Sequence, residues 1–198
     1  MTPGIAGNLP DDIRELYSCH ELHHASAILA TEFPKELAEL LTALRAFRFT
    51  KTQVLAPGGN ESEIPKTLSK LLRPEGWKER QLNASHTVND ETVRSESHYI
   101  DYVKGRVAFD LEWNSKDQTF DRDLYAFRFF FEYDKISVGV LLTRGPDLAN
   151  LFKTLGVQGK YGASTTHWDK LMPRLQSGRA GGCPILALGI SKKLYLDK

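Results

Sequence analysis

Three acidic residues near the middle of the chain, Asp101, Asp110 and Glu112, have a spacing that could bring their carboxylates together. They flank Lys104-Gly105, which we interpret as the two-residue loop of a β-hairpin. Because side chains alternate between the two faces of a strand, Asp110 and Glu112 then share one face. Like charges on one face repel each other, and a divalent cation would offset that repulsion. The spacing therefore indicates metal-dependent chemistry.

The predicted loop also sets the register of the hairpin. With Lys104-Gly105 as the loop, Asp101 lies opposite Ala108 and becomes a diagonal neighbour of Asp110. Diagonal neighbours are about 7–8 Å apart at the backbone, a distance over which two carboxylates can share one cation. The plainer alternative is a solvated polar face at the edge of a sheet, which needs no metal.

The elements that would position these acids change from helical to strand-like along the chain. Helical periodicity marks residues 13–28, 37–47 and 64–72. The elements expected after that are strands over 77–88, 92–103 and 106–113, a helix over 119–133, a strand over 136–142, helices over 146–155 and 167–175, and a strand over 184–190. This order predicts an α/β layered fold with a central mixed β-sheet flanked by helices.

Composition limits the class of protein. A chain of 198 residues, 41% of them hydrophobic, is enough for one globular domain, and we expect residues 1–75 to be mainly helical and residues 77–190 to form the α/β core. A formal net charge of +1 argues against a protein that coats nucleic acid non-specifically. No apolar run approaches the roughly 20 residues of a membrane span, and the N-terminus lacks a signal-peptide layout, so we expect a cytoplasmic protein.

The cysteines and a group of histidines need a separate interpretation. Cys19 and Cys183 are far apart in the sequence, so we expect reduced thiols and no disulfide. Cys19 also stands beside His20, His23 and His24, a group that could bind zinc. No second pair of ligands follows at zinc-finger spacing, so we interpret these histidines as surface residues.

The acidic pattern resembles the active site of PD-(D/E)xK nucleases, in which an aspartate on one strand precedes an acidic-x-polar triplet on the next. Here the aspartate is Asp101 and the triplet is Asp110-Leu111-Glu112. The surrounding sequence, over residues 77–190, resembles the BglII-like group of type II restriction endonucleases in order and spacing. The segments that carry this resemblance are 76–79, 101–113, 134–140, 178–179 and 188–190.

The resemblance implies metal-dependent hydrolysis of DNA. Asp101 and Asp110 would bind Mg²⁺ together with the backbone carbonyl of Leu111, and a metal-activated water would attack the phosphodiester, leaving a 5′-phosphate and a 3′-hydroxyl. Glu112 stands where the BglII-like group has glutamine and the superfamily at large has lysine. We therefore expect Glu112 to polarise or orient the attacking water, or to serve a second metal ion.

Two further assignments depend on the same resemblance. Lys116 could replace the superfamily lysine, but it lies four residues past Glu112, where we expect the strand to have ended. Glu61 and Glu63 could present the additional helix-borne acid that some of these nucleases use. A glutamate at a helix N-terminus is also favoured by the helix dipole alone, which is the alternative interpretation.

Two polar segments have side chains suited to reading DNA. Asn114-Ser115-Lys116-Asp117 follows the predicted active-site strand, and asparagine suits adenine while lysine suits guanine. Arg144 follows the predicted strand 136–142, at the carboxyl end where α/β sheets tend to place their sites, and could contact guanine or a phosphate. A solvated loop and an exposed arginine at a sheet edge are the alternatives. Weaker candidates for phosphate contacts are Arg122, Lys170 and Arg179.

We therefore expect a homodimer that binds double-stranded DNA at a short palindrome, with each subunit cutting one strand. By resemblance, the target has six base pairs with a GATC core, and a cognate DNA methyltransferase belongs to the same system. Two alternatives stay open. One is a repair or recombination nuclease of the same superfamily that acts on DNA structure, and the other is a DNA-binding protein without catalysis.

Overall fold

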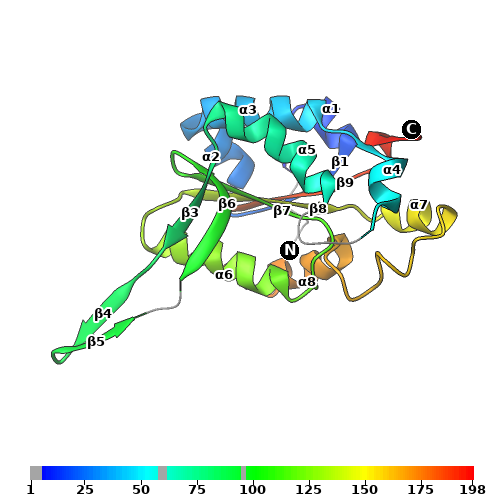
Figure 1. The fold of residues 1–198 in the computed structure, drawn as a ribbon. Helices are drawn as coiled ribbons and strands as arrows, with labels where there is room; N and C mark the ends of the chain where they lie inside the picture. The colour runs from blue at the N-terminus through cyan, green and yellow to red at the C-terminus, as the bar shows by residue number, and fades with distance from the viewer. Residues whose placement is uncertain (1–5, 58–61, 95–96) are drawn as a thin grey trace.

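A six-stranded mixed β-sheet runs through the centre of the computed structural model, which describes residues 6–57, 62–94 and 97–198 (Figure 1). The strands, in spatial order, are β1 (Tyr17–Leu22), β9 (Ile185–Ile190), β8 (Val138–Arg144), β7 (Val107–Glu112), β6 (His98–Lys104) and β3 (Lys78–Leu82). Strands β7, β8 and β9 are parallel, whereas β1, β6 and β3 run antiparallel to their neighbours. The predicted α/β fold with a central mixed sheet is confirmed.

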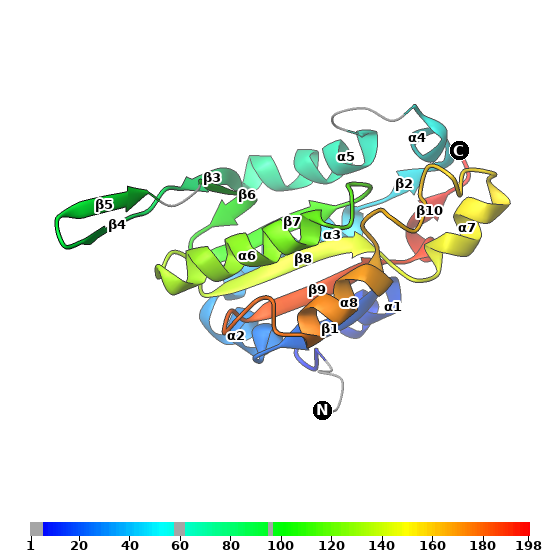
Figure 2. The same cartoon turned by 90° about the horizontal axis from the view of Figure 1, so that it is seen from below.

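Helices cover both faces of the sheet. Helices α3 and α5 lie over one face, and α6 and α8 lie over the other (Figures 1 and 2). The helices are α1 (Asp11–Leu16), α2 (Ala25–Glu32), α3 (Pro34–Ala46), α4 (Lys51–Leu55), α5 (Glu63–Leu72), α6 (Thr119–Glu132), α7 (Leu148–Thr154) and α8 (Trp168–Gln176), with short 3₁₀ turns at Arg73–Glu75 and Lys192–Leu194. Within the described ranges, none of these helices is long and apolar enough to cross a membrane.

The central strands are buried on both faces, as their continuous apolar sequences predict. Every residue of β8 and of β9 is buried. At Gly139 on β8, a Cβ atom would stand 2.8 Å from the Phe127 ring and 2.9 Å from Ile185. Only glycine lets α6 approach this strand so closely, and that close approach fixes α6 against the sheet.

Strand β1 corrects one sequence prediction. Helical spacing predicted a helix across residues 13–28, but helix α1 ends at Leu16, and Tyr17–Leu22 pairs with the whole of β9. The Tyr17 hydroxyl donates to the Leu44 carbonyl at 2.8 Å, which ties β1 to α3. Pairing with a buried strand distant in sequence therefore outweighs the local helical pattern.

The predicted strands 77–88 and 92–103 are each divided in two. Their inner halves are β3 and β6 of the main sheet, and their outer halves, β4 (Ser85–Val88) and β5 (Glu91–Arg94), form a separate hairpin that projects from the molecule (Figure 1). Asn89 and Asp90 form its turn, as predicted. Both have positive φ, 49° and 70°, the backbone conformation that a tight hairpin turn requires. Another short pair joins β2 (Phe49–Thr50) to β10 (Tyr195–Leu196).

Candidate active site

The turn between β6 and β7 lies one residue later than predicted. Lys104 pairs with Val107, so Gly105-Arg106 forms the loop, and the prediction of Lys104-Gly105 was wrong. Gly105 has a φ of 54°, which glycine adopts without strain. Lys104 stays in the strand, where its ammonium lies 2.5 Å from the Glu39 carboxylate. The hairpin register therefore differs from the predicted one, and Ala108 pairs with Val103 instead of Asp101.

A β-bulge lies at Asp101, in the pairing of β6 with β3. Where β6 pairs with β3, two residues of β6, Asp101 and Tyr102, oppose the single residue Glu79 of β3. The backbone N–H of Asp101 donates to Oδ1 of Asp110 at 2.7 Å. The backbone of one predicted metal-binding acid thus contacts the carboxylate of the other directly.

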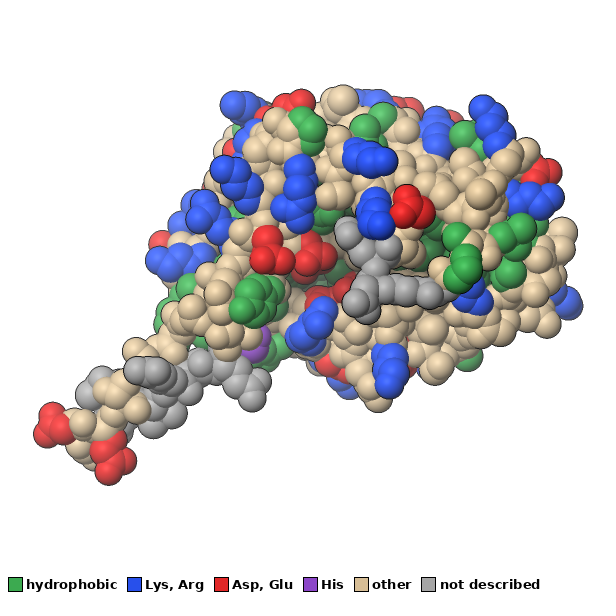
Figure 3. Space-filling model, viewed as in Figure 1, with side chains coloured by type: hydrophobic (Ala, Val, Ile, Leu, Met, Phe, Trp, Pro, Cys, Tyr) green, Lys and Arg blue, Asp and Glu red, His purple; other side chains and the backbone are tan. Residues whose placement is uncertain are grey.

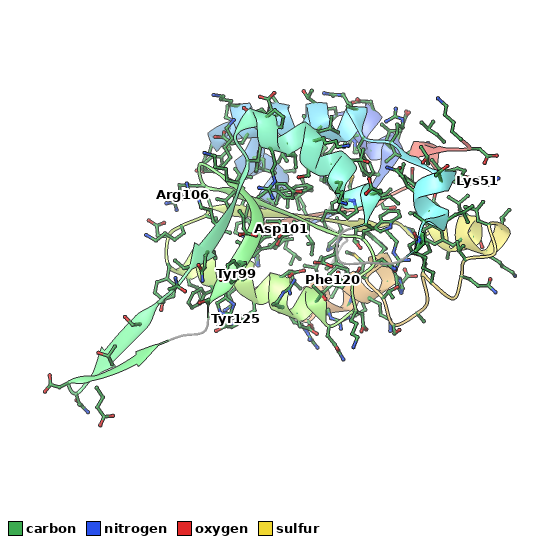
Figure 4. The ribbon with its side chains drawn as sticks, in the orientation of Figure 1. Lys51, Tyr99, Asp101, Arg106, Phe120 and Tyr125 are labelled. Carbon is green, nitrogen blue, oxygen red and sulfur yellow. The ribbon has the colours of Figure 1, made fainter. Side chains whose placement is uncertain are left out.

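Four carboxylates line one cavity of about 360 Å³ between β6, β7 and α6. They belong to Asp101, Asp110, Glu112 and Asp123, and the remaining lining residues are Ser97, His98, Tyr99, Arg122 and Ala126. Acidic side chains gather in a hollow of this face, with Lys and Arg side chains around it (Figure 3). Tyr99 and Asp101 lie along β6, and Phe120 and Tyr125 lie along α6 (Figure 4). The structure therefore brings the three predicted acids together.

Asp123 is a fourth acid that our sequence reasoning missed. It lies on α6 and is only 3% exposed. The sequence could have revealed it, because Asp123 falls on the same apolar face of the predicted helix as Phe120, Leu124 and Phe127. A carboxylate on the apolar stripe of a helix needs a partner inside the protein. The partner region here is the acidic cavity.

Burial and mutual repulsion raise the pKa values of these acids. Burial, followed by the charges of Asp123 and Asp101, raises the pKa of Asp110 well above its usual range. Burial also raises the pKa of Glu112, against a hydrogen bond from Ser115. The pKa of Asp123 rises to about 8, first through burial and then through the charge of Glu112. At neutral pH, the cavity therefore carries less negative charge than four exposed carboxylates would.

Two of the acids have buried oxygens without a hydrogen-bond partner, Oε2 of Glu112 and Oδ2 of Asp123. Buried carboxylate oxygens without partners are costly, and a hard cation with its waters satisfies them. Among the residues that the structure describes, no three His, Cys, Asp or Glu side chains already stand close enough to hold a metal ion. The donor set thus fits a divalent cation that keeps several of its waters, as Mg²⁺ does, and does not form a closed cage.

Arg122 stands at the mouth of this cavity. Its guanidinium lies 3.1 Å from Asp123 and 3.8 Å from Glu112, while its side chain is 71% exposed. An exposed guanidinium beside buried carboxylates offsets part of their charge and can also meet a phosphate. Of the three weaker candidates for phosphate contacts, Arg122 is therefore the best placed.

A second, polar cavity of about 510 Å³ adjoins the first, and Asp101 and Glu112 line both. Asn114 and Ser115 of the predicted DNA-reading segment line it, together with Leu111. The other lining residues are Ser62, Pro65, Arg73, Glu79, Tyr102, Trp113, Lys160 and Tyr161. Two of the predicted DNA-reading residues, Asn114 and Ser115, thus adjoin the predicted metal-binding residues.

The rest of the predicted DNA-reading segment differs in exposure. Lys116 is exposed and lies beyond the end of β7, as expected. Asp117 is half-buried and forms ion pairs with Lys170 at 3.7 Å and with Arg174 at 3.6 Å. Arg179 pairs with Asp121. Lys170 and Arg179 line neither cavity, whereas Arg122 does, so they are weaker candidates for phosphate contacts.

Arg144 does not fit its predicted place at the protein surface. It is only 2% exposed, and its guanidinium donates to the carbonyls of Tyr161 and Thr166 and to the Thr165 hydroxyl. A guanidinium held in this way cannot reach a base or phosphate without losing these bonds. We therefore remove Arg144 from the DNA contacts, and the alternative of a solvent-exposed arginine is equally wrong.

The helix-borne glutamates lie outside the acidic cavity or outside the described residues. Glu63 begins α5, is exposed and pairs with Lys66 at 3.0 Å. It lines neither of the two cavities. Glu61 lies outside the residues that the structure describes. The helix-borne acid of this site is thus Asp123, which comes from a different helix.

The cysteines and histidines of the zinc hypothesis are divided between two elements. Cys19 and His20 lie on β1, whereas His23 and His24 form the turn before α2. A ring nitrogen of His23 lies 3.2 Å from the Gly181 carbonyl. Cys19 and Cys183 are both free thiols.

Comparison with known families agrees with this geometry. The family model for restriction endonuclease BglII/BglIII matches residues 17–190 of the 198-residue chain. No curated protein matches the chain. The matched range includes every strand of the main sheet and all four acids of the cavity. The resemblance noted in the sequence is thereby confirmed, and the chain belongs to the BglII/BglIII restriction endonuclease family and is a type II site-specific deoxyribonuclease.

Proposed function

We propose that this enzyme uses Mg²⁺ to hydrolyse double-stranded DNA at a short palindrome, leaving 5′-phosphate and 3′-hydroxyl ends. The observation that carries the proposal is the convergence of Asp101, Asp110, Glu112 and Asp123 in one cavity. Restriction endonucleases generally depend on a divalent metal. Carboxylate oxygens supplemented by water are the ligands that Mg²⁺ prefers, which supports this ion as the cofactor.

In this proposal each of the four acids has a role. Asp101, Asp110 and the Leu111 carbonyl would hold the ion, which lowers the pKa of bound water and neutralises charge on the phosphate. Glu112, whose Oε2 has no partner, accepts a hydrogen bond from the attacking water and orients it. Asp123 faces Glu112 and fixes the position of its carboxylate.

DNA would lie along the two joined cavities. Asn114 and Ser115 line the outer cavity and are our candidates for base contacts, with the exposed Lys116 beside them. Asp117 ends this segment and is included by the family resemblance, while its carboxylate is paired with Lys170 and Arg174. Arg122 is the candidate for a contact to the phosphate next to the scissile bond.

We further propose that residues 1–198 act as a single nuclease domain and that two copies form a homodimer on the DNA. A palindromic site has a two-fold axis, and a symmetric dimer with one cavity per subunit matches that axis and cuts both strands. A hexanucleotide with a GATC core and a partner methyltransferase of the same specificity complete the proposal. Both follow from the family resemblance.

A restriction digest tests the proposed function. Purified enzyme is incubated with plasmid DNA of known sequence, with Mg²⁺ or with a chelator, and the fragment ends are sequenced. We expect discrete fragments with 5′-phosphates in Mg²⁺ and none in the chelator. A smear would instead indicate a nuclease that does not select a sequence. Intact DNA in every divalent metal would indicate a binding protein without catalysis.

A further inference from the structure

The predicted DNA-reading segment, residues 114–117, is held in place by a second loop. This loop, residues 161–166, runs beside the segment, and we call it the supporting loop. The backbone N–H of Asp117 donates to the Ser164 carbonyl at 3.0 Å, and that of Thr166 donates to the Ser115 carbonyl at 2.9 Å. The residues between these two bonds form an isolated antiparallel bridge. The two loops are thus one paired unit beyond the ends of β7 and β8.

The buried side chain of Arg144 binds the supporting loop through several hydrogen bonds. Its Nε and Nη2 donate to the Thr166 carbonyl at 2.8 and 2.6 Å. Its Nη1 donates to the Tyr161 carbonyl at 3.3 Å, and Nη2 also donates to the Thr165 hydroxyl at 2.5 Å. One planar side chain therefore binds both ends of the supporting loop. Lysine has its donors on one nitrogen at the end of a flexible stem, so it does not reproduce this planar arrangement of donors.

The charge of Arg144 is not balanced by a carboxylate. Within the described part of the chain, no Asp or Glu oxygen forms an ion pair with it. The rings of Tyr161 and Phe152 lie beside the guanidinium, with centroids 5.2 and 5.7 Å from it. Burial lowers the pKa of Arg144 to about 10, so the group is still charged at neutral pH. A buried charge that is retained without an acidic partner is costly, which favours a role beyond stability.

The residues on either side of Arg144 are hydrogen-bonded to the neighbouring strands β7 and β9. The preceding residue, Thr143, donates through its hydroxyl to the Glu112 carbonyl at 2.8 Å. The following residue, Gly145, donates to the Ile190 carbonyl at 2.9 Å, and a Cβ atom there would stand only 2.6 Å from that oxygen. The backbone on either side of Arg144 is therefore fixed to β7 and to β9.

We propose that Arg144 is a positioning residue for sequence recognition, which fixes the supporting loop and, through it, the DNA-reading segment 114–117. It touches no DNA itself. The inference rests on the proposed function of that segment. Loosening Arg144 lets the segment move relative to Glu112, so that incorrect sequences are cut with a smaller penalty.

The test compares cleavage of correct and incorrect sequences. The cleavage site is first mapped with wild-type enzyme, and duplexes with one changed base pair are then prepared. Single-turnover cleavage rates in Mg²⁺ are measured on both kinds of duplex for wild type, Arg144→Lys and Thr165→Val. We expect the ratio of the two rates to fall by at least about tenfold in Arg144→Lys and by less in Thr165→Val. Failure of wild type to cut any sequence would contradict the proposed function and not this inference.

Arg106→Lys is the matched control. Arg106 also anchors a loop, because it donates to the Ser137 hydroxyl and the Asp134 carbonyl, both at 2.8 Å, but it does so at the opposite end of β7. We expect this variant to keep the wild-type ratio. If Arg144→Lys fails to fold, as circular dichroism would show, Thr165→Val decides. An unchanged ratio in the folded variants, or an equal loss in Arg106→Lys, would overturn the inference.

Discussion

The β6–β7 hairpin has charged groups at both ends of its paired residues, which run from Lys104 and Val107 to Tyr102 and Phe109, and the two groups are built in opposite ways. At one end, Lys104 meets Glu39, so the charges are opposite and paired. At the other end, Asp101 adjoins Asp110 and Glu112, so the charges are alike. The two ends of this hairpin thus separate residues that stabilise the fold from residues that are kept for chemistry.

At the end near Glu39, the buried polar atoms have hydrogen-bond partners. Both carboxylate oxygens of Glu39 accept from Lys104, at 2.5 and 2.7 Å, and the Trp77 ring nitrogen donates to one of them at 3.0 Å. Lys104 also donates to the Glu75 carbonyl at 2.6 Å. The acidic end, in contrast, leaves carboxylate oxygens without partners. Unsatisfied buried acids are what a site for a metal ion and a phosphate needs before either is bound.

The largest expected effect comes from removing an acid at the acidic end. We expect Asp110→Ala to lower the single-turnover cleavage rate by about 1,000-fold or more, because it removes a metal ligand and with it the stabilisation of charge at the phosphate. Binding of the mapped DNA site in Ca²⁺, measured by gel shift, should persist. A variant that cuts at the wild-type rate would remove Asp110 from the site.

At the end near Glu39, a substitution should lower the stability of the fold and leave the cleavage activity unchanged. Glu39→Ala leaves the Lys104 ammonium without its acid, and we expect the free energy of unfolding to fall by about 3 kcal/mol. The measurement is chemical denaturation, with Glu63→Ala as a control because its exposed pair with Lys66 should contribute less than about 1 kcal/mol. The cleavage rate per folded molecule should not change. A large loss of that rate would show that the two ends of the hairpin are not independent.

At the acidic end, Asp123→Asn should stabilise the metal-free protein while impairing cleavage. The pKa of Asp123 rises from 3.8 to about 8, so folding favours its protonated form. Its contribution to stability is therefore full below about pH 4 and is lost as the pH rises toward 8. Asparagine avoids the cost of this buried charge but loses the 3.1 Å ion pair with Arg122. We therefore expect the free energy of unfolding to rise by a net of about 2 kcal/mol at pH 8.

Thermal or chemical unfolding at pH 5 and pH 8, in a chelator, measures this effect. The difference in stability between Asp123→Asn and wild type should be larger at pH 8 than at pH 5. Saturating Mg²⁺ should reverse the order, because the ion binds the wild-type carboxylates more strongly. Equal stability at both pH values would mean that Asp123 does not carry the repulsion we assign to it.

The same contrast explains what the sequence could predict. Alternation in β7 placed Asp110 and Glu112 on one face, and continuous apolar runs identified β8 and β9, because both patterns depend only on neighbouring residues. The position of the hairpin turn was wrong, because it depends on the contact between Lys104 and Glu39, two residues far apart in the sequence. Local pattern therefore predicts which face a side chain occupies, whereas distant contacts set the register.

The missed and misplaced residues have a similar cause. Asp123 reaches the cavity only because α6 packs over the sheet close to Gly139, a contact that its own neighbours do not reveal. Arg144 ends β8, at the carboxyl edge of the sheet where sites are common, but the loop that contains Tyr161 and Thr166 folds back over it. Helix packing and loop closure are thus the parts of this site that the sequence alone did not show.

The smallest effect we predict concerns Glu112, whose position is a glutamine in the BglII-like group. Glutamine keeps an oxygen that can accept from the attacking water, so Glu112→Gln should retain cleavage with a loss of about tenfold. It also removes a charge beside Asp123, and the metal-free protein should become slightly more stable, for the same reason as in Asp123→Asn. Single-turnover rates and unfolding curves measure both effects. A loss as large as that of Asp110→Ala would instead make the charge of Glu112 essential and identify it as a metal ligand.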